Sequence, residues 1–191
     1  MKKLFVVIIS LMCITAAKAQ TTNTKTVLEV GMNSSELSST VLDSKIGFHI
    51  GPKFEFGLPD FVKGSYLSVG AFLSLKGAEK DNVKLNPYYL EVPVHLGYKF
   101  MVNQKTKLFC SAGPYLAYGL FGKAKDDSYE TDVFGDNMMK RFDFGLGFRV
   151  GAEFSDKIQL SVGYDAGLVQ AFENDSDVKN RNFSLSLGYM F

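Results

Sequence analysis

Apolar and polar residues alternate along most of this chain with a period of two. In the stretch EVPVHLGYKF, residues 91–100, every even-numbered residue is apolar and every odd-numbered one is charged, His, Gly or Pro. Such alternation predicts a strand with two unlike faces. From residue 26 onward we find no comparable helical periodicity. The predicted strands cover 27–33, 44–56, 65–76, 87–101, 106–121, 141–154, 157–169 and 181–191.

The connections between these strands alternate in length. The short ones are 57–64, 102–105 and 155–156, and the long, polar ones are 34–43, 77–86, 122–140 and 170–180. Outer-membrane barrels show this asymmetry, with tight turns on the periplasmic side and longer loops outside. Because the strand number is even, both termini are expected in the periplasm.

The two faces of the predicted strands differ in bulk as well as polarity. One face carries large apolar side chains without a charged residue, whereas the other collects the charges and 13 of the 18 glycines. In a soluble barrel, many glycines on the water-facing side would weaken the strands without a packing return. A narrow membrane barrel instead needs glycines beside long charged side chains to fill its interior. The pattern therefore favours a membrane barrel over a soluble barrel or sandwich.

The polar face predicts a charged network inside the barrel. Counted together with Lys76 and Lys107, the polar residues expected in the lumen comprise six acids, seven bases and two histidines, so neither sign of charge dominates. A selective pore would show an excess of one sign, which makes a filled, ion-paired lumen the favoured interpretation and a small-solute channel the alternative. The predicted lumen residues are Glu29, Lys45, His49, Lys53, Glu55, Glu91, His95, Lys99, Arg141, Asp143, Arg149, Glu153 and Asp165.

Three prolines interrupt this strand pattern. Pro52 and Pro114 each follow a glycine, which suggests β-bulges, whereas Pro93 has no such explanation.

The N-terminus has the composition of an export signal. Lys2 and Lys3 precede a short apolar run, and Ala17 and Ala19 occupy positions −3 and −1 of a cleavage site before Gln20. We therefore expect a cleaved signal peptide at 1–19 and a barrel domain at 20–191. Cleavage leaves 18 basic and 20 acidic residues and a single cysteine, Cys110. This composition gives no reason to expect nucleic acid binding or a disulfide framework.

Candidate sites for chemistry are few. His49 and His95 could meet across the lumen and bind a metal, but no third ligand has a suitable spacing, so buried hydrogen-bonded imidazoles are favoured. No Ser–His pair is visible on the lipid face, where an enzyme acting on lipids would need one. We therefore expect no catalytic residue, cofactor or metal. Loop 122–140 contains Phe134 and Met139, and is either a partner-binding surface or a solvated loop without a partner.

Several sequence words resemble the PorT-like outer-membrane β-barrel family of Bacteroidota. They are YLEVPV at 89–94, AGPYL at 112–116, FDFGL at 142–146 and LGYMF at 187–191, and the resemblance spans most of the mature chain. It implies insertion by the barrel-assembly machinery, which reads a C-terminal strand ending in an aromatic residue, here Phe191. The family's namesake takes part in protein secretion and gliding.

These observations together predict an all-β protein. We expect an eight-stranded antiparallel up-and-down transmembrane β-barrel with short periplasmic turns and long extracellular loops, exported to the outer membrane. The expected role is non-enzymatic, as a structural or interaction protein, and the alternatives are a small-solute channel or a lipid-modifying enzyme. The expected partners are outer-membrane lipid, the assembly machinery and an unidentified protein bound through loops 77–86 and 122–140.

Overall fold

The computed structural model describes residues 24–37, 43–80, 83–125, 130–135, 139–171 and 178–191. The predicted signal peptide at 1–19 lies outside these residues. Within them, no helix is long and apolar enough to cross a membrane.

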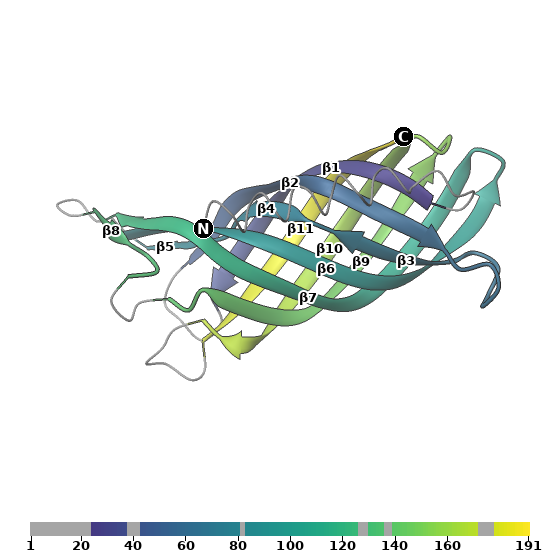
Figure 1. Cartoon of the computed structure of the whole chain (residues 1–191). Coiled ribbons are helices and arrows are strands. Elements are labelled where there is room, and N and C mark those ends of the chain that lie inside the picture. The colour runs from purple at the N-terminus through teal and green to yellow at the C-terminus, as the bar shows by residue number, and fades with distance from the viewer. Residues whose placement is uncertain (1–23, 38–42, 81–82, 126–129, 136–138, 172–177) are drawn as a thin grey trace.

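The described residues form one closed antiparallel sheet (Figure 1). Strands β3, β4 and β5 together make the third wall of the barrel, and the short β8 pairs with the end of β7. The last strand pairs with the first, from Val27 opposite Met190 to Leu37 opposite Asn180, which closes the ring. The prediction of an eight-stranded antiparallel barrel is therefore confirmed. The strands are β1 (Thr24–Leu37), β2 (Asp43–Gly57), β3 (Ser65–Gly70), β4 (Phe72–Leu75), β5 (Ala78–Lys80), β6 (Val83–Asn103), β7 (Thr106–Lys125), β8 (Glu130–Asp132), β9 (Phe142–Phe154), β10 (Ile158–Gln170) and β11 (Lys179–Met190).

Two of the predicted long loops are partly strand. In 77–86, β5 pairs with the beginning of β6, and in 122–140, β7 continues to Lys125 and pairs with β8. The prediction that these segments are loops throughout was wrong. Their polar side chains resemble those of a solvated loop, but beyond the membrane a hairpin can pair its backbone while water solvates its side chains. Figure 1 shows β5 and β8 extending past the rest of the barrel at one end.

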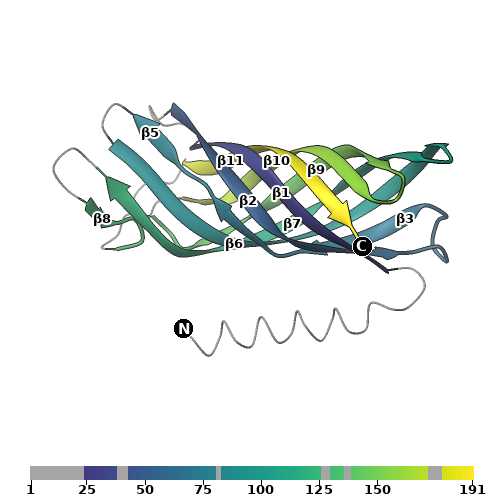
Figure 2. The ribbon, with the colours of Figure 1, turned by 90° about the horizontal axis from the view of Figure 1, so that it is seen from above.

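The opposite end carries the short connections, and we call it the short-turn end. Its connections are 58–64, 104–105 and 155–157. Ser155 and Asp156 have φ angles of 52° and 56°, which suits the type I′ turn of a tight hairpin. The beginning of β1 and the last residue also lie at this end, because the Phe191 N–H donates to the Thr26 carbonyl at 2.9 Å. Figure 2 shows the C-terminus at the end where β3 begins.

The bulky apolar side chains point outward. Leu96, Phe148 and Leu187, on three different strands, are 54%, 50% and 52% exposed. Charged residues such as Glu91 and Asp165 alternate with them and are buried in the interior. The outer wall is therefore an apolar belt around a polar lumen, as a membrane barrel requires.

The prolines coincide with gaps in the hydrogen-bond ladder instead of bulges. Registers on either side of Pro52 and of Pro114 are unchanged, so the predicted bulges are absent. Strands β3 and β4 are separated only at Ala71, which the register places opposite Pro52 on β2, and the preceding residue Gly70 lies opposite Pro93 on β6. Ala71 donates its N–H to the Pro52 carbonyl at 2.9 Å. Because neither proline has an N–H to offer in return, the strand is interrupted at this point.

Candidate functional site

The barrel lumen is the candidate site, because all thirteen polar residues predicted there contribute to its walls. Eight of them are buried: Glu29, His49, Glu55, Glu91, His95, Asp143, Glu153 and Asp165. Most of the bases are only half-buried, as expected of long side chains that reach inward from the strand. The thirteen residues do not form one network but divide into groups along the barrel axis.

The first group, which we call the short-turn cluster, lies in the half of the lumen nearest the short turns. Lys99 Nζ lies 2.6 Å from Glu55 Oε2 and 2.5 Å from Glu153 Oε2. Lys53 Nζ lies 2.5 Å from Glu29 Oε2 and also donates to Gln159 Oε1 at 3.0 Å. The short-turn cluster consists of Glu29, Lys53, Glu55, Lys99, Glu153 and Gln159.

Cross-links within the short-turn cluster span strands that are not neighbours in the sheet. Gln159 on β10 donates to Glu55 on β2 at 2.9 Å, and Lys99 on β6 bridges Glu55 on β2 and Glu153 on β9. Glu55 and Glu153 therefore face charged or amide donors on non-adjacent strands, whereas Glu29 pairs with Lys53 on the adjacent strand β2. The Lys99 ammonium also lies 5.0 Å from the centre of the Tyr66 ring, which closes one side of the cluster.

The middle of the lumen holds an ion pair and a histidine. Arg149 donates to both oxygens of Asp165, at 2.7 and 3.0 Å, in the bidentate geometry that favours Arg–carboxylate pairs. Asn182 donates to the same carboxylate at 3.2 Å.

His49 is held on both sides of its ring. Its Nδ1 lies 2.8 Å from the side-chain oxygen of Asn33, and its Nε2 lies 3.0 Å from Ser186 Oγ. Because the amide oxygen can only accept, Nδ1 carries the proton. His95 differs, since its buried Nε2 has no hydrogen-bond partner among the described residues. Across the described residues no group of three or more His, Cys, Asp or Glu side chains is placed to hold a metal ion.

The half of the lumen nearest the long connections contains a third polar group. Lys76 forms an ion pair with Glu91, and its ammonium lies 4.8 Å from the centre of the Tyr115 ring. Asp143 accepts from the Tyr115 hydroxyl at 3.2 Å and from Asn180 at 3.0 Å. Lys45 donates to Asn86 at 2.7 Å.

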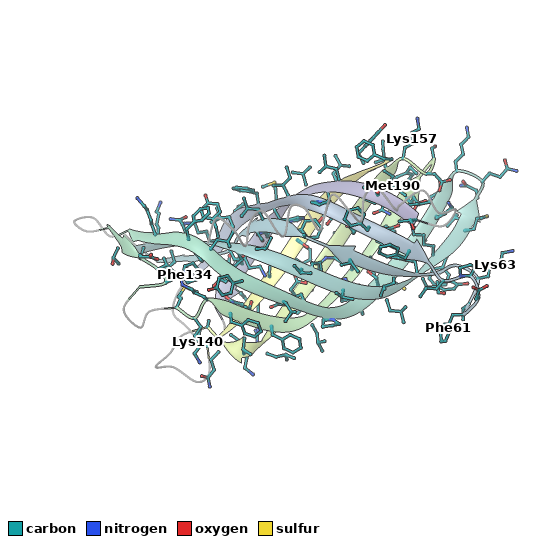
Figure 3. All side chains as sticks on the ribbon, viewed as in Figure 1. Phe61, Lys63, Phe134, Lys140, Lys157 and Met190 are labelled. Carbon is teal, nitrogen blue, oxygen red and sulfur yellow. The ribbon has the colours of Figure 1, made fainter. Side chains whose placement is uncertain are left out.

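An apolar plug closes the mouth beyond this third group. The plug is built from Val133, Phe134 and Met139, which come from the connection between β8 and β9. Val133 has no exposed surface, and Phe134 packs edge-on against Tyr89 with ring centres 5.6 Å apart. The guanidinium of Arg141 lies 4.9 Å from the Phe134 ring and donates to the Gly119 carbonyl at 3.1 Å. Figure 3 shows Phe134 lying over the barrel at the end opposite Lys63.

The plug depends on a glycine at one position. A Cβ added to Gly119 would lie 2.3 Å from the Phe134 ring, so the ring occupies the space that a side chain on β7 would fill.

The burial of Phe134 and Met139 in the plug differs from both interpretations of loop 122–140. Phe134 and Met139 do not form an exposed binding surface, and they do not belong to a solvated loop either. The loop residues Tyr129 and Met138 are not described.

Several lumen residues escaped the sequence analysis. Gln159, Asn33 and Ser186 are uncharged but bridge the charged groups, and Tyr66, Tyr89 and Tyr115 fill space between them. All six share the parity of the predicted charges or, in the case of Ser186, of the inward glycine Gly188 on the same strand. This parity could have identified the six residues, but the prediction considered only charged residues, histidines and glycines.

Comparison with known proteins shows which family this architecture represents. The model of the family described as "Outer membrane protein beta-barrel domain" matches residues 5–191. No curated protein matches the chain in sequence.

Solved structures share the fold at low sequence identity. Neisserial surface protein A is 12% identical over 88% of this chain and 97% of its own, with a TM-score of 0.55. The outer membrane enzyme PagL is 14% identical over 86% of this chain and 97% of its own, with a TM-score of 0.53. Ail, the attachment invasion locus protein of Yersinia pestis, is 17% identical over 88% of this chain and 99% of its own, with a TM-score of 0.47. At these identities the likeness to the first two structures shows the fold alone.

Proposed function

Because the chain belongs to the outer membrane protein beta-barrel domain family and is an outer-membrane protein, we propose that it is a sealed, non-enzymatic barrel that acts through its rims. The lumen serves as the structural core of such a barrel. Contacts with a protein partner take place at the end where β5 and β8 project.

The stacking of polar groups and plug along the axis is the observation that carries this proposal. From one end to the other the lumen contains the short-turn cluster, the Arg149–Asp165 pair, the Lys76–Glu91 pair and the apolar plug. The cavity found among the central groups has a volume of about 40 Å³, which is room for very few water molecules. A conducting pore needs a continuous aqueous path, and side chains occupy the axis at each of these levels.

Single-channel recording tests the sealed lumen. The refolded protein in a planar bilayer is expected to leave the baseline conductance unchanged. The matched variant Arg149→Ala/Asp165→Ala removes both partners of the central pair, so it widens the lumen without leaving a buried unpaired charge. Steady open conductance of the unmodified protein would overturn the proposal in favour of a small-solute channel.

The proposed interaction surface is the projecting end formed by 77–86 and 122–140. The backbone of this end is paired in β5–β6 and β7–β8, and Thr131 and Asp132 on it are exposed. A photo-crosslinking residue at Thr131 should give a discrete protein adduct in cells. The same residue at Leu160, on the lipid-facing wall, is the control, and adducts of equal pattern at both positions would argue against a partner at this end.

An enzymatic role receives less support from the same geometry. The arrangement of Ser186, His49 and Asn33 resembles a nucleophile, a base and an orienting group, but Ser186 is only 2% exposed and lies inside the closed lumen. A lipid substrate on the outer wall has no route to it. Mass spectrometry of outer-membrane lipids from a deletion strain should therefore find the lipids unchanged, and a new lipid species would favour the enzyme.

We further propose a place within the family and an orientation. The sequence words that resemble the PorT-like group support assignment to it, with recognition of Phe191 by the barrel-assembly machinery and a link to cell-surface or secretion machinery. The export signal at 1–19 and the shared location of Thr26 and Phe191 support periplasmic termini. A cysteine at Thr131 should then react with an impermeant maleimide on intact cells, whereas a cysteine at Lys105 should not, with Cys110 replaced by Ser in both.

A further inference from the structure

A groove on the outer wall lies next to the short-turn end. Its floor is formed by the small side chains of Cys110, Val150 and Ala152, and its ridges include Phe100, Leu108 and Leu160. Phe100, Leu108, Ala152 and Leu160 lie opposite one another on four successive strands. The wall therefore dips at Ala152 between larger neighbours. The groove has a volume of about 560 Å³, within the range of about 300–1,000 Å³ typical of small-molecule pockets.

Two lysines stand at the rim beyond this groove. Lys105 ends the turn between β6 and β7, and Lys157 ends the turn between β9 and β10. The two turns are bonded to each other, because Ser155 donates its N–H to the Lys105 carbonyl at 2.6 Å. Both lysines are exposed, and Figure 3 shows Lys157 pointing away from the barrel.

These two cations are not neutralised by the nearby acid. Asp156 directly precedes Lys157 in the sequence but is paired with Lys25 and Lys107. Neither Lys105 nor Lys157 forms an ion pair within the described ranges. The rim therefore presents two positive charges directly beyond an apolar groove, and this combination complements an anionic headgroup above an acyl chain.

We propose that this groove binds one anionic phospholipid, with an acyl chain lying along Ala152 and Cys110 and the phosphate held by Lys105 and Lys157. The identification of a phospholipid rests on the orientation proposed above, which places these turns in the periplasmic leaflet. Binding to vesicles of defined composition does not depend on that orientation, so failure of either proposal can be recognised separately.

The chain contains no tryptophan, so a single introduced tryptophan reports on the groove. Phe100→Trp places it on a ridge, and Phe56→Trp places it on β2, at the same end but outside the groove. Each variant is reconstituted in vesicles in which either phosphatidylglycerol or phosphatidylcholine carries acyl-chain bromine, which quenches tryptophan on contact. At Phe100→Trp we expect brominated phosphatidylglycerol to be favoured about fivefold, and at Phe56→Trp we expect no preference.

Further variants in the Phe100→Trp background separate the charge from the groove. Lys105→Gln/Lys157→Gln should abolish the preference, whereas Lys63→Gln, which removes a lysine from turn 58–64, should retain it. Ala152→Phe fills the groove from the lipid-facing side and should reduce quenching by both lipids. If the double lysine variant does not refold, Ala152→Phe and Lys63→Gln still test the site.

Three results would overturn the proposal. Equal quenching by the two lipids at Phe100→Trp would mean that the groove has no headgroup preference. An equal phosphatidylglycerol preference at Phe56→Trp would mean general attraction to the rim. Oxidative cross-linking of Cys110 to Cys110 in vesicles would mean that a second copy of the chain covers the groove.

Discussion

Arg149 and Asp165 illustrate how the lumen is stabilised at the scale of single residues. Both lie among strands with no open edge, and their two hydrogen bonds satisfy a charge that would be costly to bury alone. Arg149→Met is expected to lower the free energy of unfolding by about 3–5 kcal/mol, because it leaves the Asp165 carboxylate unpaired. Urea unfolding in detergent, followed by far-UV circular dichroism, measures this change.

The double variant Arg149→Met/Asp165→Leu provides the internal comparison. It removes both charges together, so most of the lost stability should return. Glu36→Gln is the control at an exposed pair, where Arg181 lies 3.8 Å away, and it should cost at most about 1 kcal/mol. If Arg149→Met proves no more harmful than Glu36→Gln, the central pair does not stabilise the barrel.

In contrast to the buried Arg149–Asp165 pair, Asp156 forms its ion pairs at the water-exposed rim. Hydrogen bonds from Lys107 and then Lys25 hold the pKa of the Asp156 carboxyl below its ordinary value of 3.8. The folded state therefore binds this proton less readily than the unfolded state. The stabilisation is fully present above about pH 4 and is lost as the pH falls further, towards the pKa of the folded state.

Replacing this carboxylate should give a pH-dependent difference. At pH 7 we expect Asp156→Asn to cost less than about 1 kcal/mol, because the side chain is half exposed and solvent screens the pair. The cost should shrink as the pH falls from 5 to 2. Urea midpoints across this range test it, with Asp60→Asn on turn 58–64 as the control. A cost that grows on acidification would contradict the assigned pairing.

Partners across the lumen could not be predicted at this scale, although the inward direction of most charged side chains could. Parity along a strand determines which face a residue occupies. Lys99 on β6 meets Glu153 because its long side chain reaches past β7 to β9, and parity contains no information about that reach. The same reason explains why Gln159 was missed, since only its reach to Glu55 makes it a central residue.

At the scale of elements, the eight walls were predictable because lipid on one side and a narrow lumen on the other impose a strict period of two. The projecting ends of the walls were not predictable, because outside the membrane no lipid imposes a period of two on the strands. β5 and β8 therefore arose from segments that read as polar loops. The apolar plug escaped prediction because Val133, Phe134 and Met139 lie in a polar context and become buried only when the connection folds over the mouth.

The close approach of β2 to Ala71 explains why Gly51 is required. A Cβ on Gly51 would lie 2.0 Å from the Ala71 carbonyl oxygen, so β2 and the broken third wall approach each other more closely than an alanine allows. Gly51→Ala is expected to destabilise the barrel by about 1–3 kcal/mol or to prevent refolding, because backbone rather than a flexible side chain must move.

Gly135→Ala is the matched control for this prediction. Its added Cβ would meet only Asp132, at 3.4 Å or more, so the variant should unfold at the same urea concentration as the unmodified chain. Equal stability of the two alanine variants would show that the close approach at Ala71 is relaxed without cost.

At the scale of the whole molecule, closure joins the first strand to the last. β1 and β11 pair along eleven register positions, and the Phe191 N–H adds a bond to Thr26. A closed sheet leaves no unpaired edge in hydrocarbon, so folded and unfolded forms should differ sharply in compactness. Unheated protein is therefore expected to migrate differently from boiled protein in detergent gels, and this shift provides a measure of the folded fraction.

A substitution at Phe191 can distinguish an effect on assembly in cells from an effect on the stability of the folded barrel. Its ring is 76% exposed and contacts Tyr189, with ring centres 5.0 Å apart, so it adds little to the packing of the folded barrel. If the assembly machinery reads this residue, Phe191→Ala should reduce the folded fraction in cells several-fold. The purified variant should nevertheless refold in detergent with a free energy of unfolding within about 1 kcal/mol of the unmodified protein.

Phe100→Ala removes another exposed aromatic ring that is not C-terminal, and its folded fraction in cells should be unchanged. A loss in cells matched by an equal loss on refolding would mean that Phe191 acts through stability, and equal effects of the two variants in cells would mean that position at the C-terminus carries no signal.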